Sequence, residues 1–499
     1  MGETLNFLAL DLGAESGRAM VGQFDGKRLV QTPEPLNEVY RFPNVPVRLP
    51  DGLHWDVLRL WSDVKQGLTS ALRRYTGNLA AVGLDTWGVD FALLDRTGAL
   101  VGNPYHYRDA RTDGMMEQAF RYVPRDEIFA RTGIQFMPIN TLYQLFSMVV
   151  HKSPELDVAQ TFLTMPDLLN HWLTGHQVCE FSNATTTQCY DPNADDWALP
   201  MLERLGIPTH LFPRVVQPGT LLGQLLPAVE EEVGGSGQRT LMAIAPACHD
   251  TGSAVAAVPA RGPNFAWISS GTWSVMGVEW PNALINPQSL QFNITNEGGV
   301  CDTFRVSKNI MGLWLVQECR RIWAKTGEEL SYDALAHIAA EAPPFVSLVD
   351  PDDADFLKPG DMPARIRTYC RRTGQPIPES KGAIVRCVLE SLALKYAIVL
   401  GRLEQLVGRR LEPVHMVGGG TQNRLLCQFT ADATGRPIVA GPVEATAAGN
   451  ILMQALALGC IGSLEEGREV IRNSFDVRSY DPGDRAGWDD ARRRLEGML

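Results

Sequence analysis

A carboxylate, two glycines and an arginine fall within eight residues near the start of the chain. Asp11 lies at the end of an apolar run, and Gly13, Gly17 and Arg18 follow it. Small residues let several backbone N–H groups point at an anion, and arginine adds a planar charged donor. A buried carboxylate without a partner is costly, so Asp11 either faces a hydrated Mg²⁺ ion or pairs with Arg18 within a hairpin.

Two further turns of small residues lie in the second half of the chain. Ser269 to Thr272 follows an apolar run, and Val417 to Asn423 contains three successive glycines before an expected helix from Arg424. Bare backbone of this kind lets a flat ligand such as adenine or ribose lie against it. The alternative for the second turn is a tight strand-to-helix connection. Three such turns together indicate phosphate binding more strongly than any one alone.

A tryptophan and two carboxylates follow another apolar run. Asp85, Trp87 and Asp90 come directly after the expected strand Ala81–Leu84, and Gly88 lies among them. These residues could line a sugar pocket, with the indole ring against the C–H face of the sugar. The alternative is a strand end with solvated acids and a tryptophan in the core.

The best candidate for a catalytic carboxylate is Asp250. It stands between His249 and Thr251, where an apolar segment ends and a helix of small residues, Ser253–Val258, is expected. Aspartate at such a position most commonly caps a helix, and the local sequence favours that role. Phosphoryl transfer to a hydroxyl group, however, needs a carboxylate that takes the proton, and a helix N-terminus nearby would favour the transferring phosphate.

The common nucleotide and hydrolase motifs are absent from the sequence. It contains no G-x-x-x-x-G-K-[ST] and no strand-linked G-x-G-x-x-G, so neither a P-loop nor a Rossmann dinucleotide site is indicated. It also lacks H-E-x-x-H and G-x-S-x-G, which removes the simplest metalloprotease and hydrolase interpretations.

The bulk composition is that of a globular enzyme with more than one domain. The chain has 499 residues, of which 45% are hydrophobic and 20% charged, and 499 residues exceed what one core normally holds. The formal net charge is −12, so we expect no general attraction for nucleic acid or an anionic membrane. No apolar run reaches the roughly 18 residues needed to span a bilayer.

The cysteines and the first residues indicate the cytoplasm. Nine cysteines are scattered, without a C-x-x-C pair or a spacing that fits zinc. Met1 to Asn6 lacks the basic region of a signal peptide, and Phe7 to Leu10 is too short for its apolar region. Cys370 and Cys387 could meet in space, which in a reducing compartment indicates packing more often than a disulfide.

The elements that position these turns alternate between strands and helices, which favours layered α/β domains. Phe7–Leu12, Arg18–Phe24 and Arg28–Val30 predict an antiparallel β-meander, with a hairpin signal between the last two. Phe265–Ile268 and Trp273–Val278 predict the same strand–turn–strand unit again. The repetition indicates two domains of related architecture.

The domain boundary is expected near residue 245. We predict an N-terminal domain at residues 1–245, a C-terminal domain at 246–480 and a helix or tail at 481–499. Glu230–Thr240, which is first charged and then rich in glycine, predicts a surface loop near this boundary. Ala342–Pro363, rich in proline and aspartate, predicts an irregular excursion that could serve as a lid.

Longer strings across residues 5 to 480 resemble the FGGY carbohydrate kinases. They are far more specific than any single glycine turn. The strings are Leu10–Ala14, Ser16–Arg18, Asp85–Phe91, Tyr107–Asp109, Thr141–Gln144, Asn183–Gln188, His249–Thr251, Ser269–Ser274, Asn293–Gly299, Lys308–Leu315, Gln375–Ser380, Val417–Gly420 and Gly441–Ala445.

The resemblance implies an α/β fold of two actin-like, ribonuclease-H-like domains with a catalytic cleft between them. It implies ATP and Mg²⁺ as cofactors, a ketose as acceptor, and a monomer or small homo-oligomer. Residues implied for ATP are Ala14, Glu15, Ser16, Gly17, Arg18, Thr272, Gln317 and Gly419. Residues implied for the sugar are Gly88, His249, Asp250, Thr251 and Asn309. Asp250 would accept the proton, and Asp11 would face the Mg²⁺ ion, through water.

One residue departs from the family pattern. Glu15 stands in the first phosphate turn where a small residue is expected, and an acidic side chain pointing inward would repel phosphate. We therefore expect Glu15 to face solvent or to pair with a lysine or arginine.

The resemblance also implies L-rhamnulose, phosphorylated at its 1-hydroxyl, as the first expectation for the substrate. Fuculose, xylulose or ribulose are alternatives within the same class. Outside it, the chain could be an actin-like ATP-binding protein without sugar chemistry, or a catalytically inactive sugar sensor. The acids around Trp87 argue against the former, and the intact Asp250 and phosphate turns argue against the latter.

Overall fold

The chain folds into two compact units that are interleaved along the sequence. The computed structural model describes residues 4–30, 34–76, 78–235 and 241–499. Unit 1 comprises Met1–Pro259, Glu279–Val306 and Ala445–Phe475, and unit 2 comprises Ala260–Val278, Ser307–Glu444 and Asp476–Leu499. The domain boundaries expected from the sequence, at residues 245 and 480, remain a prediction.

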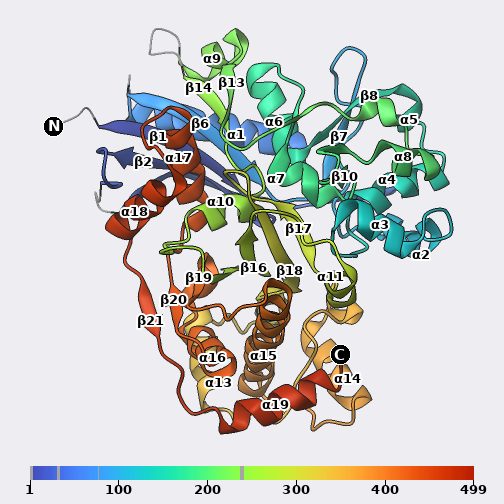
Figure 1. Ribbon diagram of the computed structural model, residues 1–499, viewed down its shortest axis with the longest axis vertical. Coiled ribbons are helices and arrows are strands. Elements are labelled where there is room, and N and C mark those ends of the chain that lie inside the picture. The colour runs from blue at the N-terminus through green and yellow to red at the C-terminus, as the bar shows by residue number, and fades with distance from the viewer. Residues whose placement is uncertain (1–3, 31–33, 77, 236–240) are drawn as a thin grey trace. The chain divides into compact units, whose positions relative to one another are not determined.

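Unit 1 is built on a six-stranded sheet (Figure 1). Its strands, in spatial order, are β13 (Thr220–Gln224), β14 (Met242–Ala245), β6 (Leu79–Thr86), β1 (Leu5–Leu12), β2 (Ser16–Phe24) and β3 (Leu36–Pro43). β1, β6 and β14 run parallel to one another, whereas β2 and β3 continue the sheet in antiparallel pairing. β6 is buried along its whole length, as expected for a parallel strand covered on both faces.

The predicted meander at the start of the chain is confirmed, but its third strand is not the predicted one. Residues 28–30 form no strand, and Leu29 makes only an isolated bridge to Phe24. The third strand begins at Leu36 instead, and it pairs with β2 along most of its length. The hairpin signal at Asp25-Gly26 therefore makes a tight turn without a strand after it.

Unit 2 repeats this arrangement. Its strands, in spatial order, are β18 (Phe304–Met311), β16 (Trp273–Trp280), β15 (Ala266–Ser270), β19 (Val414–Val417), β20 (Ile438–Ala440) and β21 (Arg478–Tyr480). β15 and β16 are antiparallel, and β15, β19 and β20 are parallel. The predicted second strand–turn–strand unit is thus confirmed. β18 begins in unit 1, beside β17 (Thr295–Gly298), and ends in unit 2.

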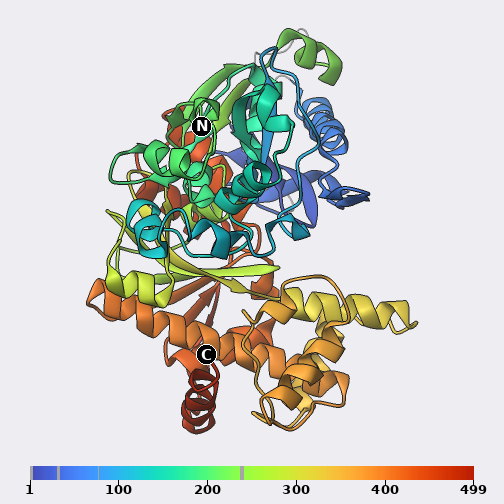
Figure 2. The ribbon, with the colours of Figure 1, turned by 90° about the vertical axis from the view of Figure 1, so that its right-hand side faces the viewer.

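Helices cover both sheets. Those of unit 1 are α1 (Val57–Arg74), α2 (Met115–Ala119), α3 (Arg125–Thr132), α4 (Thr141–Val150), α5 (Glu155–Val158), α6 (Met165–Thr174), α7 (Phe181–Ala184), α8 (Leu199–Arg204), α9 (Pro227–Val233), α10 (Asp250–Ala256), α11 (Pro287–Phe292), α17 (Ala445–Ala457) and α18 (Leu464–Ser474). Those of unit 2 are α12 (Trp314–Lys325), α13 (Tyr332–Glu341), α14 (Met362–Arg372), α15 (Lys381–Val407), α16 (Arg424–Thr434) and α19 (Ala486–Glu496). α15 is the longest of these helices and is seen as the long orange helix in Figure 2. It packs against α13 and α16.

Shorter pieces complete the two units. Paired short strands are β4 (Val47–Leu49) with β5 (Gly52–His54), β7 (Phe91–Asp95) with β8 (Ala159–Thr164), β9 (Cys179–Glu180) with β12 (Val215–Val216), and β10 (Tyr190–Asp191) with β11 (Asp196–Trp197). Single 3₁₀ turns are η1 (Ala110–Thr112), η2 (Thr185–Thr187), η3 (Thr209–Leu211), η4 (Ala354–Phe356) and η5 (Gly419–Gln422).

The two segments predicted to be irregular have different outcomes. Part of the expected loop at 230–240 is helical, because α9 extends to Val233, and residues 236–240 lie outside the described part of the chain. The excursion at 342–363 is irregular as predicted, apart from η4 and the first residues of α14. In the described part of the chain, no helix has the length and apolar character needed to cross a membrane.

Two helices from distant parts of the sequence, α10 and α17, pack closely within unit 1. A Cβ atom at Gly449 of α17 would lie 1.7 Å from the backbone oxygen of Ser253 in α10. No side chain fits at that distance, so glycine permits the close approach of the two backbones. α17 also lies against β1 and β6, where the side-chain amide of Gln454 donates a hydrogen bond to Leu8 O at 2.9 Å.

Replacing Gly449 by alanine should therefore destabilise unit 1. We expect the variant to lose about 1–3 kcal/mol of unfolding free energy, since the added methyl group must push α10 away from α17. Gly401 in α15 is the matched control, because a Cβ there meets only Arg492 Nη2 at 3.6 Å. Gly401→Ala should be neutral or stabilising by up to about 1 kcal/mol. Calorimetry of both variants makes the comparison, and equal melting temperatures would contradict it.

Candidate active site

The β1–β2 turn is closed by an ion pair. Arg18 Nη2 lies 2.8 Å from Asp11 Oδ2, so the pairing considered as the alternative for these two residues is present. The Gly13 N–H group donates to Ser16 O at 3.0 Å and tightens the turn. Glu15 is exposed, as expected from its charge. The turn therefore keeps its acidic side chain in solvent while Arg18 is held at its base.

Gly17 has a packing role that differs from the one expected. It lies in β2, and a Cβ atom there would fall 2.1 Å from the ring of Phe42 on the neighbouring strand β3. The aromatic ring covers the position, so glycine is required at residue 17 by the sheet itself. A close approach of phosphate explains the residue type less well than this contact does.

A second buried carboxylate lies beside Asp11. Asp85 is its partner in the register of β6 against β1, and its side chain is 0% exposed. Asp85 Oδ2 accepts a hydrogen bond of 2.6 Å from Asn450 Nδ2 of α17, whereas Oδ1 has no hydrogen-bond partner. Burial, followed by the nearby charge of Asp11, raises the pKa of Asp85 well above its usual value. An orphan acceptor in this position is costly unless it meets a cation or a donor from a ligand.

Asp90 is buried as well, and it holds the loop after β6 together. Its Oδ2 accepts hydrogen bonds from the indole N–H groups of Trp55 at 2.6 Å and Trp87 at 3.0 Å, and from the Tyr107 N–H group at 3.2 Å. Oδ1 accepts from Gln144 Nε2 at 2.9 Å. The acids flanking Trp87 are thus not solvated. Asp90 stabilises the loop through the hydrogen bonds that it accepts.

The residue before Asp90 is strained. Val89 has φ of 67°, a left-handed conformation that is rare for a β-branched side chain. Three hydrogen bonds fix it: the Val89 N–H group donates to Thr186 Oγ1, and Val89 O accepts from Thr141 Oγ1 and from Gln144 Nε2. Such strain persists where the surroundings over-determine the backbone, typically at ligand sites. Gly88, predicted to contact the sugar, is the residue immediately before Val89.

Asp250 is the first residue of α10, and the N-cap is His249. The helix-capping role that the local sequence favoured is therefore wrong. Thr251 donates to Asp250 Oδ1 through its N–H group at 2.5 Å and its hydroxyl at 3.1 Å. The side chain of Asp250 is 29% exposed, and burial raises its pKa. These contacts fix one carboxylate oxygen and leave Oδ2 available to a ligand.

The end of β6 and the start of α10 lie side by side. The Thr86 N–H group donates to Cys248 O at 2.9 Å, and Thr86 forms an isolated parallel bridge with His249. Four of the five residues predicted for the sugar therefore belong to unit 1: His249, Asp250 and Thr251 lie at the start of α10, and Gly88 follows two residues after Thr86. The fifth, Asn309, lies on the part of β18 that belongs to unit 2.

Behind His249 is a buried pair of opposite charges. Glu297 of β17 and Arg305 of β18 lie 3.2 Å apart, and both approach the ring of His249. The distances to His249 Nδ1 are 3.3 Å from Glu297 Oε2 and 3.0 Å from Arg305 Nη2. On its other edge, His249 Nε2 is 3.5 Å from Asp250 Oδ1.

The residues predicted for the nucleotide in unit 2 lie around the β15–β16 turn. Thr272 lies in the turn, and its backbone oxygen accepts a hydrogen bond of 3.1 Å from the Trp314 N–H group at the start of α12. Gln317 follows one turn later in α12, and its buried Oε1 has no hydrogen-bond partner. A nucleotide amine or hydroxyl would satisfy that acceptor.

The glycine turn after β19 lies beside the end of β15, at Ser270. A Cβ atom at Gly420 would fall 2.0 Å from Ser270 Oγ, and one at Gly418 would fall 2.9 Å from Ser270 O. At Gly419 nothing lies within 4 Å. The predicted strand-to-helix turn is therefore present, since η5 and α16 follow β19, and Gly419 alone of the three presents open backbone.

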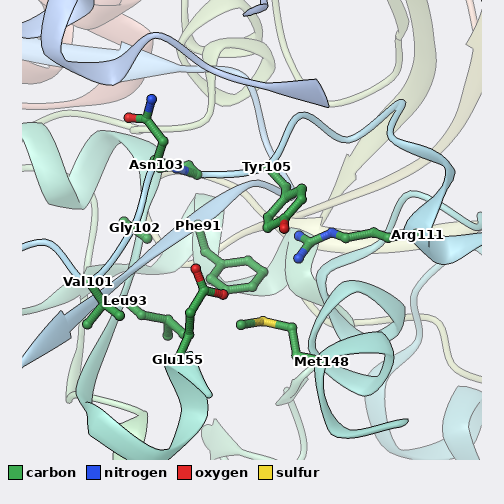
Figure 3. A pocket seen from close by; sticks show the side chains of 11 residues that line it. Phe91, Leu93, Val101, Gly102, Asn103, Tyr105, Arg111, Met148 and Glu155 are labelled. Carbon is green, nitrogen blue, oxygen red and sulfur yellow. The ribbon is translucent and has the colours of Figure 1, made fainter. Parts of the chain in front are cut away.

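A pocket in unit 1 is lined by residues of β7, the segment 101–105, η1, α4 and α5 (Figure 3). Phe91, Tyr105, Arg111, Met148 and Glu155 are among the residues that line it. Arg111 lies over the Tyr105 ring, 4.0 Å from its centre, and its Nη2 donates to Gln144 Oε1 at 2.6 Å. Arg111 thus connects the pocket, through Gln144, to the hydrogen bonds around Asp90. None of the residues that line the pocket is a predicted site residue.

Two family models match nearly the whole chain. The N-terminal domain of the FGGY family of carbohydrate kinases matches residues 6–256, and the C-terminal domain of the same family matches residues 266–458. The chain belongs to the FGGY family of carbohydrate kinases. It is 44% identical to the rhamnulokinase of Bacteroides thetaiotaomicron, over 97% of this chain and 98% of that one. It is 38% identical to the rhamnulokinase of Oceanobacillus iheyensis, over 95% and 97%.

Solved structures share the fold at low identity. A gluconate kinase from Lactobacillus acidophilus matches with a TM-score of 0.81 at 15% identity, over 99% of this chain and 98% of that one. A Plasmodium falciparum glycerol kinase with ADP matches with a TM-score of 0.75 at 16% identity, over 100% and 97%. The α/β fold of two related units, expected from the sequence, is that of sugar kinases in this family.

The roles of several residues around the site could not be predicted from their positions in the sequence. Asn450, which holds Asp85, comes from a helix 365 residues further along the chain. Glu297 and Arg305 stand in or beside a string that resembles the family, but their partner His249 lies on another element. Gly83 is a weak sequence signal of the Asn450 contact, because a Cβ atom at residue 83 would lie 2.3 Å from Asn450 Oδ1.

Asp90 gives a pH-dependent prediction. Burial raises the pKa of Asp90 to about 6, despite the hydrogen bonds that it accepts. A carboxyl group whose pKa is raised by folding stabilises most below its unfolded pKa of about 4, and this stabilisation is lost as the pH rises through about 6. Asp90→Asn should be less stable at all these pH values, because it presents a donor to Gln144. The difference in unfolding free energy between the wild type and Asp90→Asn should shrink by roughly 3 kcal/mol as the pH rises from about 4 to about 6. Urea unfolding at several pH values measures it, and a constant difference would contradict it.

Proposed function

We propose that this protein transfers the γ-phosphoryl group of ATP to the 1-hydroxyl of L-rhamnulose, giving ADP and L-rhamnulose 1-phosphate. The observation that carries the choice of sugar is the 44% identity to a rhamnulokinase over 97% of the chain. Other relatives of that name share 38% and 40% over at least 95% of it. A role in the breakdown of L-rhamnose follows from this reaction.

Asp250 is the proton acceptor in this proposal. The hydroxyl oxygen of the sugar forms a bond to the γ-phosphorus, the bond between that phosphorus and the β–γ bridging oxygen breaks, and the hydroxyl proton passes to Asp250. Thr251 fixes Oδ1, so Oδ2 is the oxygen that meets the hydroxyl. The raised pKa of Asp250 makes it a better base than an exposed aspartate.

The sugar is assigned to Gly88, His249, Asp250, Thr251 and Asn309. In unit 1 the strained Val89 supports this assignment, because it holds the adjacent Gly88 backbone in one conformation. The nucleotide is assigned to residues 14–18, Thr272, Gln317 and Gly419. Support comes from the short turn at Gly13, the orphan Gln317 Oε1 and the open backbone at Gly419.

Mg²⁺ is proposed as the partner of ATP, held through water near Asp11. Over the described ranges, no group of three or more histidine, cysteine or acidic side chains is arranged to hold a metal ion directly. Mg²⁺ usually binds through one or two carboxylates, waters and substrate phosphates, so the neighbouring Asp11 and Asp85, with its orphan Oδ1, fit it. When bound, the ion would neutralise charge on the transferring phosphate.

We also propose the cytoplasm as the compartment, and a monomer or small homo-oligomer as the assembly. All nine cysteines are present as thiols, which fits a reducing compartment. Cys370 and Cys387 do meet in space: their thiols are hydrogen-bonded, which lowers the pKa of Cys370.

The role of Asp250 is tested by Asp250→Asn. The variant should bind ATP and L-rhamnulose as the wild type does, but kcat should fall by about 10²- to 10⁴-fold because the amide cannot accept the proton. Asp157→Asn, an exposed position in α5, is the control and should keep full activity. Calorimetric titration and an ADP-release assay separate binding from turnover. Turnover of Asp250→Asn near the wild-type value would remove Asp250 from this role.

The identity of the sugar is tested with a panel of ketoses. Ranked by kcat/KM in the ADP-release assay, L-rhamnulose should exceed fuculose, xylulose and ribulose by at least about tenfold, since a site that hydrogen-bonds sugar hydroxyls rejects misplaced ones strongly. If another ketose ranks first, the proposed substrate is wrong. If ATP is hydrolysed equally with or without every sugar, the chain is instead an ATP-binding protein without sugar chemistry.

A further inference from the structure

The ring of His249 has different neighbours on its two edges. Nδ1 faces Arg305 Nη2 at 3.0 Å and Glu297 Oε2 at 3.3 Å. Nε2 faces Asp250 Oδ1 at 3.5 Å. The hydrogen bond made by one ring nitrogen decides whether the other carries the proton. The state of His249 therefore depends on which neighbour controls Nδ1.

Arginine is a donor only, and it keeps its protons in proteins. A proton on His249 Nδ1 would point at the Arg305 donor, which is the closer of the two neighbours. The neutral ring with its proton on Nε2 avoids this conflict, because Nδ1 then accepts from Arg305 and the Nε2–H group points toward the carboxylate of Asp250.

Arg305 is itself held rigidly. Its side chain is 0% exposed, its Nε donates to Gly298 O at 2.8 Å, and its Nη2 is within 3.3 Å of Ser182 O. Glu297 supplies the compensating charge at 3.2 Å, and Thr295 Oγ1 donates to Glu297 Oε1 at 3.2 Å. A buried guanidinium without such a partner would be strongly destabilising.

The backbone before the ring is fixed as well. The His249 N–H group donates to Ser182 Oγ at 3.1 Å, and that hydroxyl donates to Glu180 Oε2 at 2.7 Å. Glu180 Oε2 also accepts the Cys248 N–H group at 3.0 Å. The backbone of His249 is therefore held by Ser182, and Nδ1 of its ring is held by Arg305. Together these contacts fix the direction in which Nε2 points.

We infer that Arg305, held by Glu297, is a positioning residue that keeps His249 as the neutral tautomer protonated at Nε2. In this state the Nε2–H group faces Asp250 Oδ1 at 3.5 Å, adds to the two Thr251 donors that hold this oxygen, and leaves Oδ2 free for the acceptor hydroxyl. The inference rests on the proposed role of Asp250 in phosphoryl transfer. It adds to that role a second support for the orientation of Asp250, beside the hydrogen bonds from Thr251.

The tautomer can be measured directly in the full-length protein labelled with ¹⁵N-histidine. Long-range ¹H–¹⁵N correlations distinguish the two neutral forms, and His249→Gln identifies the resonances of residue 249. In the wild type without substrates, the proton should be on Nε2. A proton on Nδ1 would overturn the inference, whatever sugar the enzyme uses, so this result is independent of the proposed substrate.

Two substitutions should then have different effects on the tautomer of His249 and on kcat. Arg305→Met leaves Glu297 as the sole neighbour of Nδ1, so the proton should move to Nδ1 and kcat should fall by roughly 10- to 100-fold, with the KM for ATP little changed. Glu297→Gln keeps the Arg305 donor, so the tautomer should stay and kcat should remain within about threefold of the wild type, although stability falls.

The control is Arg468→Met, which breaks another buried ion pair of unit 1, between Arg468 and Glu279 at 2.5 Å. It should lower the melting temperature and leave kcat unchanged. A purely structural role of Arg305 predicts the same pattern for Arg305→Met. Equal kcat in the two folded variants would therefore overturn the inference, and if Arg305→Met does not fold, the wild-type spectrum decides it.

Discussion

The cost of burying negative charge governs the design of unit 1. Asp11, Asp85 and Asp250 come from two neighbouring strands and a short helix, and the pKa values of Asp85 and Asp250 are raised chiefly by burial. Each carboxylate has a separate device that offsets part of this cost. Arg18 pairs with Asp11, Asn450 donates to Asp85, and Thr251 donates to Asp250. The offset is incomplete, because Asp85 Oδ1 has no hydrogen-bond partner, and this acceptor supports the proposal of a cation beside Asp11 and Asp85.

The loop after β6 contains another buried carboxylate, Asp90, whose hydrogen bonds are more complete than those of Asp85. Asp90 is 1% exposed and accepts four hydrogen bonds, so its side chain fixes the backbone around Val89. Two aspartates five residues apart therefore have different tasks. The number of donors around each decides which one supports the site and which one is available to it.

Much of the fold could be predicted because its signals are local. The meander of β1 and β2 and its repeat in β15 and β16 follow from apolar runs on either side of small-residue turns. The third strand was misplaced because Asp25-Gly26 marks a tight turn, and nothing local tells whether a strand follows it at once. The helical role of Asp250 was also misassigned, since the residue before it, His249, is an uncommon helix cap.

The candidate site was predictable only where one segment carries both partners, as Asp11 and Arg18 do. Residues that act together through tertiary contacts, such as His249 with Glu297 and Arg305, have no spacing that reveals them. The long strings that resemble the family include Glu297, yet they do not say what it touches. Why Gly17 is a glycine also became clear only from the ring of Phe42 on the next strand.

The interleaving of the two units has a consequence for biosynthesis. During translation the sheet of unit 1 is nearly complete once β14 has emerged, but α17, which supplies Asn450 and lies against β1 and β6, follows about 200 residues later. Until then the Asp85 carboxylate lacks its amide donor, and the parts of β1 and β6 that α17 contacts lack this helix. The contacts of α17 with the rest of unit 1 can therefore form only after the whole of the intervening polypeptide has been made.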